Sequence, residues 1–355
     1  MVVLLEPVCH SWMHEEVDAG FLGLVREVCS EEVVYVGERD HLKCISSIYR
    51  GGGVSYKQIV GFDTGNEWDD YKMTVYYFKM ILMVMRECCP SQLFILCAYR
   101  PCILAAELAA VVNKKCRVFV LLHGMVEESK NRSASYRKLF RLSGYCPNIR
   151  FLTYSPHCTA KYWGMSEDKM TFINHPYIKP RERVMRKGDP DKTVIGVIGG
   201  CANNKALHVI RLVNKKEIDK EYEFWIVSRF GEIFRGVPHV KVLELEFSRE
   251  QKREIMSYMD FLLLPYGKQE YAISASGVLW DAVSNEVPCL MLDSRYFGYY
   301  LPYGIGYQAT NIQGLADMIE QRILLGRDGN VFFQGVDQLE QYNYKIMEEL
   351  LDVRT

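Results

Sequence analysis

The sequence predicts an α/β protein with two doubly wound, Rossmann-like parallel-sheet domains that face a cleft. Three observations support this prediction. The 355 residues are too many for one ordinary hydrophobic core, short apolar runs alternate with stretches of helical spacing, and one polar segment interrupts the alternation. We therefore expect an N-terminal domain over 1–180, a linker over 181–192, a C-terminal domain over 193–335 and a C-terminal helix over 336–355.

In the N-terminal half, five short apolar runs bounded by turn residues have the character of buried strands. The runs are Val2–Leu5, Val33–Val36, Leu93–Ala98, Val118–Leu122 and Phe151–Tyr154. Helical spacing occurs between them at Gly20–Val28, Tyr71–Arg86 and Ile103–Val112. This alternation predicts a parallel sheet with helices on both faces. Gly51–Gly53 is interpreted as a turn and not a phosphate-binding loop, because no strand and helix are expected to flank it closely.

The same alternation restarts after the linker. The expected strands are Val194–Ile198, Phe224–Val227, Val240–Leu243, Phe261–Leu264 and Pro288–Leu292, and the expected helices are Asn203–Lys215, Ser248–Tyr258 and Ser276–Asn285. Beyond Asn311 the chain is expected to be largely helical, with Leu339, Ile346 and Leu350 available for packing. The pattern predicts a second doubly wound sheet, and such sheets bind ligands at the carboxyl ends of their strands. Asp189-Pro190-Asp191, in the linker, is interpreted as a solvated turn.

Charge and cysteine content narrow the range of functions. Lys and Arg total 43 and Asp and Glu total 44, so the formal net charge of −1 gives no indication of a nucleic-acid partner. The 12 cysteines are scattered through apolar runs, so reduced, buried thiols are expected and a structural zinc site is not. Without a basic leader or an unbroken apolar span, a cytoplasmic protein is expected. The basic segment 130–141 could provide peripheral membrane contact, although such a stripe is more often a solvated helix face.

A candidate phosphate site follows the strand Phe261–Leu264. The next expected helix opens with Ser276 and Gly277, which offer backbone N–H groups, a hydroxyl and the positive end of the helix dipole. An ordinary N-cap has the same sequence. Gly199 and Gly200 end an earlier strand, and Lys205 lies at the start of the helix after it, where it is either a phosphate ligand or a solvated cation.

Together these residues resemble the donor-nucleotide region of GT-B glycosyltransferases, which use nucleotide-activated sugars. The matching segments are Asp260-x-x-x-x-Pro265, Ser276-Gly277-Val278-Leu279, Asp281-Ala282, Val287-Pro288, and Ile198-Gly199-Gly200 followed by Asn204-Lys205. The resemblance implies a nucleotide-diphosphate sugar as donor, with no cofactor and no metal required. It implies donor contacts from Gly199, Gly200, Lys205, Glu270, Ser276, Gly277 and Val278.

The sequence departs from the retaining branch of that family, which carries two glutamates separated by seven residues. Glu270 and Asp281 are the nearest equivalents and are further apart, so the stereochemical outcome stays open. Asp281 is expected to cap its own helix or to form a salt bridge within it.

Candidate catalytic residues cluster after the first strand. His10, His14, Glu15 and Asp18 crowd one strand-to-helix loop, and any of them could act as general base for an acceptor hydroxyl. His10 and His14 also have the spacing of a helical metal pair, but no third ligand pattern follows, so no metal is expected. His123, at the end of the strand Val118–Leu122, is a further catalytic candidate or an incidental strand-end residue.

The resemblance therefore implies a metal-independent hexosyl- or related transferase of carbohydrate biosynthesis. Its acceptor would be a glycan, a lipid-linked molecule or another hydroxyl compound. Two alternatives stay open: a sugar-nucleotide epimerase of the same fold, and a non-catalytic glycan-binding relative. A nicotinamide-dependent dehydrogenase is disfavoured because no strand is followed by G-x-G-x-x-G.

Overall fold

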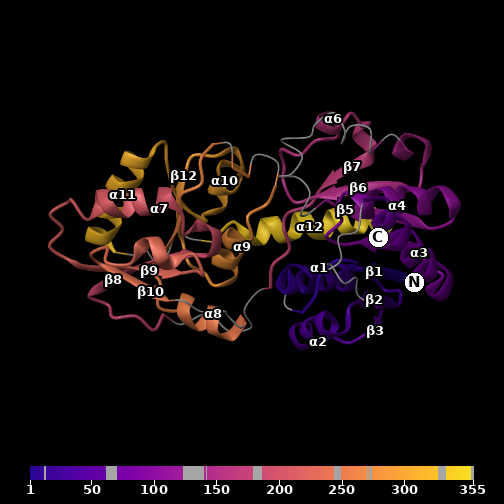
Figure 1. The fold of residues 1–355 in the computed structure, drawn as a ribbon, viewed down its shortest axis with the longest axis horizontal. Helices are drawn as coiled ribbons and strands as arrows, with labels where there is room; N and C mark the ends of the chain where they lie inside the picture. Colours follow the sequence, from indigo (N-terminus) through magenta and orange to yellow (C-terminus); the bar gives the residue numbers. More distant parts are fainter. Residues whose placement is uncertain are drawn as a thin grey trace. The chain divides into compact units, whose positions relative to one another are not determined.

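The chain folds into two compact units in the computed structural model (Figure 1). Unit 1 comprises Met1–Ile178, Ile273–Ala275 and Leu339–Thr355, and unit 2 comprises Lys179–Ala272 and Ser276–Gln338. The structure describes residues 1–11, 13–60, 70–122, 140, 142–178, 186–243, 249–268, 270–271, 274–326 and 333–352.

Unit 1 is built on a seven-stranded sheet with the order β3-β2-β1-β4-β5-β6-β7. Its strands are β1 (Val2–Leu5), β2 (Val33–Gly37), β3 (Val54–Gln58), β4 (Gln92–Ile95), β5 (Arg117–Leu121), β6 (Ile149–Thr153) and β7 (Met170–Phe172). Every pairing is parallel. Because β1 pairs with both β2 and β4, the strand order reverses there, and this is the topological switch point of the sheet.

Helices cover both faces of this sheet. Alternate side chains of β1 point to opposite faces, so Val3 and Leu5 pack with α3 (Asp70–Cys88) and α4 (Arg100–Val112). The other face carries α1 (Glu15–Val28), α2 (Arg39–Ile48) and the C-terminal part of α12 (Val336–Leu351). Unit 1 also contains the short helix α6 (Ala160–Trp163) and the 3₁₀ turns η2 (Leu142–Tyr145) and η3 (Glu167–Lys169).

Unit 2 is built on a six-stranded sheet with the order β10-β9-β8-β11-β12-β13. Its strands are β8 (Lys192–Ile198), β9 (Glu221–Val227), β10 (Val240–Leu243), β11 (Phe261–Leu264), β12 (Cys289–Leu292) and β13 (Gly306–Ala309). All pairings are again parallel, and β8 lies at the switch point between β9 and β11.

The helices of unit 2 lie between successive strands in the chain, except for the last of them, which follows β13. They are α7 (Asn204–Val213), α8 (Arg249–Met256), α9 (Gly277–Ser284), α10 (Arg295–Tyr300) and α11 (Ile312–Leu325), with 3₁₀ turns η4 (Gly199–Cys201), η5 (Gly231–Phe234) and η6 (Leu301–Tyr303). α7 and α11 pack together, and Lys216, just beyond α7, pairs with Asp317 at 2.8 Å and Glu320 at 2.7 Å.

The predicted fold class of two doubly wound parallel sheets is confirmed. One local argument is wrong: α2 and β3 do flank Gly51–Gly53 closely. The order here is helix, loop, strand, whereas a phosphate-binding loop runs from a strand to a helix. Gly51–Gly53 is therefore still interpreted as a turn, because of this reversed order. Asp189-Pro190-Asp191 is an exposed turn as predicted, with Asp191 N donating to Asp189 Oδ1 at 2.9 Å.

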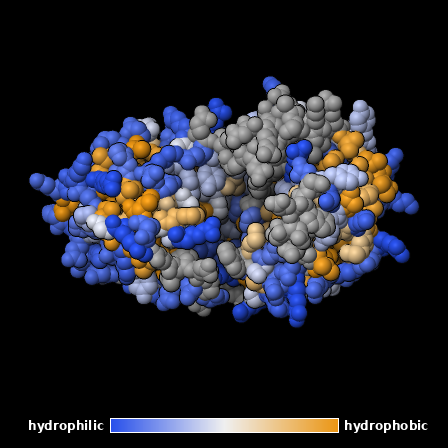
Figure 2. All heavy atoms as spheres, in the orientation of Figure 1, coloured by the Kyte–Doolittle hydropathy of each residue, from blue (hydrophilic) through white to orange (hydrophobic). Residues whose placement is uncertain are grey.

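The surface is mainly hydrophilic on the face drawn in Figure 2, and hydrophobic residues gather most clearly over the end of unit 1 that carries α3 and α4. Within the part of the chain that the structure describes, no helix is both long and apolar enough to cross a membrane. The basic segment 130–141 lies outside the described residues except for Phe140, which is buried against Phe151 and Trp163. Its peripheral membrane contact stays a prediction.

Candidate functional site

Polar residues gather at the switch point of each sheet. In unit 1, the loop from Glu6 to His14 follows β1 and Cys97 follows the adjacent strand β4. In unit 2, Gly199 and Gly200 follow β8, and the segment that contains Glu270 follows the adjacent strand β11. Carboxyl ends of adjacent parallel strands meet at one edge of a sheet, so each unit presents one candidate site there.

In unit 2 the structure brings Lys205 and Glu270 into direct contact as an ion pair. Glu270 Oε2 also accepts a hydrogen bond from Gly267 N at 2.5 Å. A Cβ at Gly267 would lie 3.3 Å from Lys205 Nζ, so the glycine allows the ammonium group to approach the backbone closely. Lys205 and Glu270 are each 42% exposed, which leaves the cation accessible to a ligand.

The start of α7 is what positions Lys205. Asn203 caps this helix, with its Oδ1 accepting from Lys205 N at 2.9 Å and Ala206 N at 3.2 Å. Gly199 has a left-handed φ of 57°, which suits a glycine, and its carbonyl accepts from Ser228 Oγ at 3.0 Å. A Cβ at Gly199 would meet no atom within 4 Å, so the backbone at the end of β8 is open to a ligand.

α9 begins at the same edge of the sheet because it follows β11. Ser276 is fully buried and its Oγ accepts from Leu279 N at 3.4 Å, so the hydroxyl serves as N-cap of the helix. Gly277 is exposed, and a Cβ there would meet no atom within 4 Å. Val278 is half-buried. The first N–H groups of α9 have no intrahelical partner, and a ligand could reach them over Gly277.

Two residues of the family-like segment have structural roles. The expectation that Asp281 forms its salt bridge within its own helix is wrong, since its Oδ1 pairs with Lys252 Nζ of α8 at 2.7 Å. Sequence spacing within α9 could not reveal this partner on another helix. Asp260 is buried beside β11 and accepts from Val194 N of β8 at 2.9 Å and from Arg186 at 2.8 Å, so it ties the two strands together.

In unit 1 the four candidate bases have different environments. His14 is the N-cap of α1 and His10 lies before it in the loop, so the two do not form the helical pair that their spacing suggested. His10, His14 and Glu15 are half-buried, whereas Asp18 is 2% exposed. His123 lies outside the described residues, and its catalytic role stays a prediction.

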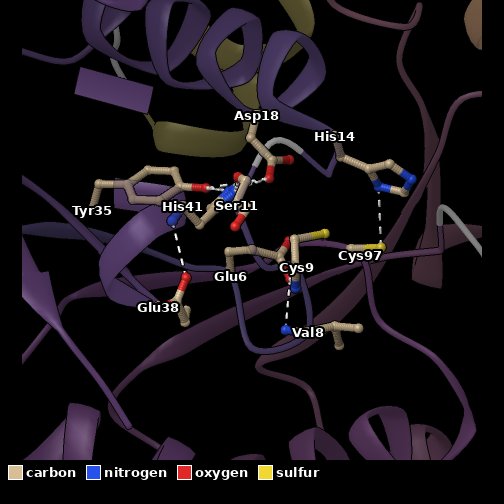
Figure 3. Close-up of polar contacts among 10 residues, drawn as sticks. All are labelled: Glu6, Val8, Cys9, Ser11, His14, Asp18, Tyr35, Glu38, His41 and Cys97. Carbon is tan, nitrogen blue, oxygen red and sulfur yellow. Dashed lines mark hydrogen bonds and ion pairs between the residues drawn. The ribbon is translucent and has the colours of Figure 1, made fainter. Parts of the chain in front are cut away.

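Asp18 is held in a buried network with His41 and Tyr35 (Figure 3). His41 Nε2 lies 3.0 Å from Asp18 Oδ2, and the Tyr35 hydroxyl lies 3.3 Å from the same oxygen and 3.1 Å from His41 Nε2. Burial favours the neutral imidazole, but the hydrogen bond and charge of Asp18 outweigh it and raise the pKa of His41. His41 Nδ1 is in turn 2.8 Å from the carbonyl oxygen of Ser11. This network fixes Asp18 as an ion-pair partner.

A second group joins the loop to the end of β4. The His14 ring points to Cys97 (Figure 3), with 3.3 Å between Nδ1 and Sγ. Burial opposes a charge on His14, but the hydrogen bond and charge of Cys97 raise its pKa to about 9. The hydrogen bond with Cys9 lowers the pKa of Cys97. Burial acts in the opposite direction, but the hydrogen bond and charge of His14 add to the lowering, so the pKa stays below its ordinary value.

The loops that carry this group have unusual backbone geometry. Ser11, His14 and Cys97 have left-handed φ values of 48°, 53° and 44°. Such values are uncommon outside glycine and cost free energy that the surrounding structure must supply. They occur at loops on adjacent strands, so the strain coincides with the polar cluster.

Sequence reasoning missed five members of this cluster: Glu6, Cys9, Tyr35, His41 and Cys97. They come from four separate segments, and only the strand order brings Cys97 beside Cys9. Glu6 offered a signal, because an acidic residue at the end of an apolar first strand is unusual.

No family model and no curated protein matches the sequence. Solved structures do match. A glycosyltransferase from Rickettsia africae is 11% identical, and the alignment covers 99% of this chain and 98% of that one with a TM-score of 0.64. An Anabaena protein in complex with UDP and glucose is 10% identical over 98% of this chain and 95% of its own, with a TM-score of 0.61. The UDP-GlcNAc 2-epimerase from Neisseria meningitidis, bound to UDP-GlcNAc, is 13% identical over 100% of both chains, with a TM-score of 0.61.

At these identities the similarity concerns the fold. The chain has the GT-B type of fold that is found in glycosyltransferases and in UDP-GlcNAc 2-epimerase. This confirms the fold that the sequence resemblance implied.

Proposed function

We propose that the protein is a glycosyltransferase that moves a sugar from a nucleotide-diphosphate-sugar donor to a hydroxyl group of a glycan or lipid-linked acceptor. One observation carries the proposal: Lys205 lies beside Gly267 and Glu270 at the switch point of unit 2, on the sheet edge where α9 also begins. A cation and a helix N-terminus at such an edge are the groups that a diphosphate needs. The fold neighbours include proteins whose structures contain UDP or UDP-GlcNAc.

The chemistry assigned to unit 2 is stabilisation of the leaving group. When the bond from sugar to diphosphate breaks, negative charge develops on the diphosphate. Lys205 and the open N–H groups of α9 would stabilise that charge before and during the reaction, so no metal ion is required. Glu270 holds the ammonium of Lys205 near Gly267 until a donor arrives.

The chemistry assigned to unit 1 is removal of the acceptor proton. Asp18 is buried and bound to His41, and His14 is bound to Cys97. His10 of the loop and Glu15 at the start of α1 are both half-buried, so their side chains are partly accessible to an acceptor hydroxyl.

Calorimetry with UDP tests the donor site. Lys205→Ala should weaken binding by about 1 to 3 kcal/mol, which is the usual size of a hydrogen bond to a charged group. Lys187→Ala is a matched control, because Lys187 belongs to the same unit and pairs with Glu254 at 3.6 Å on the surface. Ser276→Ala should also weaken binding, since the capping hydroxyl orders the start of α9. Unchanged UDP affinity in both the Lys205 and Ser276 variants would refute the assignment.

A sugar-nucleotide epimerase is the second candidate, favoured by the epimerase neighbour whose whole length aligns with this chain. Incubation with sugar nucleotides, followed by NMR, separates the two activities. Acceptor-dependent release of the nucleoside diphosphate supports transfer, and interconversion of the sugar nucleotide without acceptor supports epimerisation. Donor binding without either reaction would identify a non-catalytic relative.

A further inference from the structure

Three soft ligand atoms lie together at the switch point of unit 1. Cys9 Sγ, Cys97 Sγ and a ring nitrogen of His14 are all within 4.8 Å of one another. The Cys97 Sγ to His14 Nδ1 distance is 3.3 Å. With Zn–S bonds of about 2.3 Å and Zn–N bonds of about 2.0 Å, ligand atoms in a tetrahedral zinc site lie about 3.3 to 3.8 Å apart. Small side-chain movements would therefore bring all three atoms to coordinating positions.

The Glu6 carboxylate is a second and independent sign of a cation. Glu6 is 1% exposed, and its Oε1 accepts from Val8 N at 2.7 Å and Cys9 N at 2.8 Å. Its Oε2 is buried and has no hydrogen-bond partner among the described residues. The carboxylate lies within 4.8 Å of Cys9 Sγ and of a carboxylate oxygen of Asp18. A buried carboxylate oxygen without a donor is costly, and a metal ion satisfies it.

The other buried acid in the cluster already has a cationic partner. Asp18 pairs with His41, whereas none of the ion pairs found among the described residues involves Glu6. Glu6 is therefore the buried acid of the cluster that has no ionic partner among the described residues. It also shares Cys9 as a neighbour with the sulfur and nitrogen ligands.

We propose that unit 1 binds a divalent zinc-type cation through Cys9, His14 and Cys97, and that Glu6, which groups with Cys9 and Asp18 in the structure, turns its free oxygen to the fourth position when the ion binds. Two sulfurs, one imidazole and one carboxylate form a donor set that suits Zn²⁺ and disfavours Mg²⁺ and Ca²⁺. Binding would displace the thiol protons to solvent. The metal would join the loop after β1, the start of α1 and the loop after β4, and His10 lies between two of the ligands in sequence.

The test uses the full chain after removal of metal with a chelator. Titration with Co²⁺ should give one ion per chain, with thiolate-to-metal charge-transfer absorption and the visible bands of a tetrahedral site. Zn²⁺ should displace Co²⁺ and raise the melting temperature. Cys97→Ala and His14→Ala should each weaken Zn²⁺ binding by more than about 100-fold, because removing even an outer-shell partner costs 10 to 100-fold. Cys116→Ala is the matched control, since Cys116 is buried in the same unit outside the cluster.

A measurement on the unmodified protein keeps the test decisive if a variant fails to fold. X-ray absorption of the zinc-loaded protein should show two sulfur ligands in the first shell. One equivalent of Zn²⁺ should also protect Cys97 from alkylation. The proposal is wrong if the protein binds no Zn²⁺, if the first shell contains no sulfur, or if alkylation of Cys97 is unaffected. None of these readouts depends on sugar transfer.

Discussion

Asp18 shows how burial decides the role of a residue that is chemically capable of several. As part of the sequence it is one of four candidate bases, but in the structure it is 2% exposed and lies 3.0 Å from His41 Nε2. Its Oδ2 is already engaged by His41 and by the Tyr35 hydroxyl, so it is poorly placed to meet an acceptor hydroxyl. The sequence showed that several possible bases follow the first strand, but it did not show which of their side chains would be buried.

Glu107 is a single buried residue that should make the free energy of unfolding depend on pH. This residue of α4 is fully buried, and its Oε1 accepts from Ser143 N at 3.0 Å. Burial raises its pKa from 4.5 to about 8, against the opposing effect of the Ser143 hydrogen bond. Between these two pH values the folded state holds a proton that the unfolded state has released. The free energy of unfolding should therefore fall as pH rises from 4.5 to about 8.

Glu107→Gln should remove this part of the pH dependence. Urea denaturation at pH values below and above that window measures it, and the variant should gain stability relative to the natural protein at the higher pH. The gain should be of order a few kcal/mol, since one pKa unit corresponds to about 1.4 kcal/mol. Exposed Glu27 provides the control, because Glu27→Gln should leave the slope unchanged. Equal slopes for the natural protein and Glu107→Gln would contradict the prediction.

At the scale of elements, the sequence predicted the central strands and the edge strand β10, but missed three other edge strands. β1 and β4 are buried on both faces and read as continuous apolar runs. β3, β7 and β13 all lie at sheet edges and had no such signal. In β3, Ser55, Tyr56 and Gln58 are exposed, so the apolar pattern that identifies a strand is absent.

In the C-terminal helix, apolar spacing predicted which residues pack but not what they pack against. Its apolar spacing predicted that Leu339, Ile346 and Leu350 would pack, and the structure buries Leu339 and Leu350 and partly buries Ile346. Which sheet receives the helix was not predictable, because the partners are far away in sequence. Gln92 of β4 donates to the carbonyl oxygen of Leu351 at 3.1 Å across 259 positions.

Separation along the sequence also explains which residues of the candidate sites could be predicted and which could not. Lys205, Ser276 and Gly277 were recognisable because each follows a strand within a few residues or opens the next helix. The Cys9 and Cys97 pair was not, because 88 positions separate the two residues and only the pairing of β1 with β4 brings them together.

Gly277 tests whether the start of α9 binds phosphate. A Cβ there would meet no protein atom within 4 Å, so Gly277→Ala should leave the melting temperature unchanged or slightly raised. The added methyl group would occupy the space through which a phosphate approaches the first N–H groups, so UDP affinity should fall about tenfold or more. Gly144→Ala is the matched control, since Gly144 also has an open Cβ position and lies in unit 1. Equal UDP affinities for both variants would show that phosphate does not approach α9.

At the scale of the whole molecule, two similar sheets carry different chemistry at their switch points. Unit 2 offers an exposed lysine, open glycines and a helix start, whereas unit 1 offers imidazole, thiol and carboxylate groups. Fixed positive groups suit a diphosphate, and basic side chains suit an acceptor hydroxyl.

This difference predicts that Mg²⁺ and Mn²⁺ do not support turnover. Lys205 and the N–H groups of α9 are assigned to the leaving group, so adding either ion should leave the rate unchanged. Activity that disappears with chelator and returns with Mg²⁺ or Mn²⁺ would contradict the leaving-group assignment. Activity that returns with Zn²⁺ alone would instead trace the loss to the thiolate site of unit 1, because hard cations avoid sulfur ligands.

The division of labour between the units gives the most discriminating prediction. Removal of a general base typically slows turnover about 100 to 10,000-fold and leaves ground-state donor binding nearly unchanged. His10→Ala, His14→Ala, Glu15→Gln and Asp18→Asn should therefore be compared for turnover and for UDP affinity, with Lys205→Ala as the opposite case that loses affinity. At least one loop variant, His10→Ala or Glu15→Gln first, should be almost inactive and bind UDP normally. Near-normal turnover in all four would move the base elsewhere, with His123 as the next residue to replace, or would mean that the reaction retains configuration without a protein base.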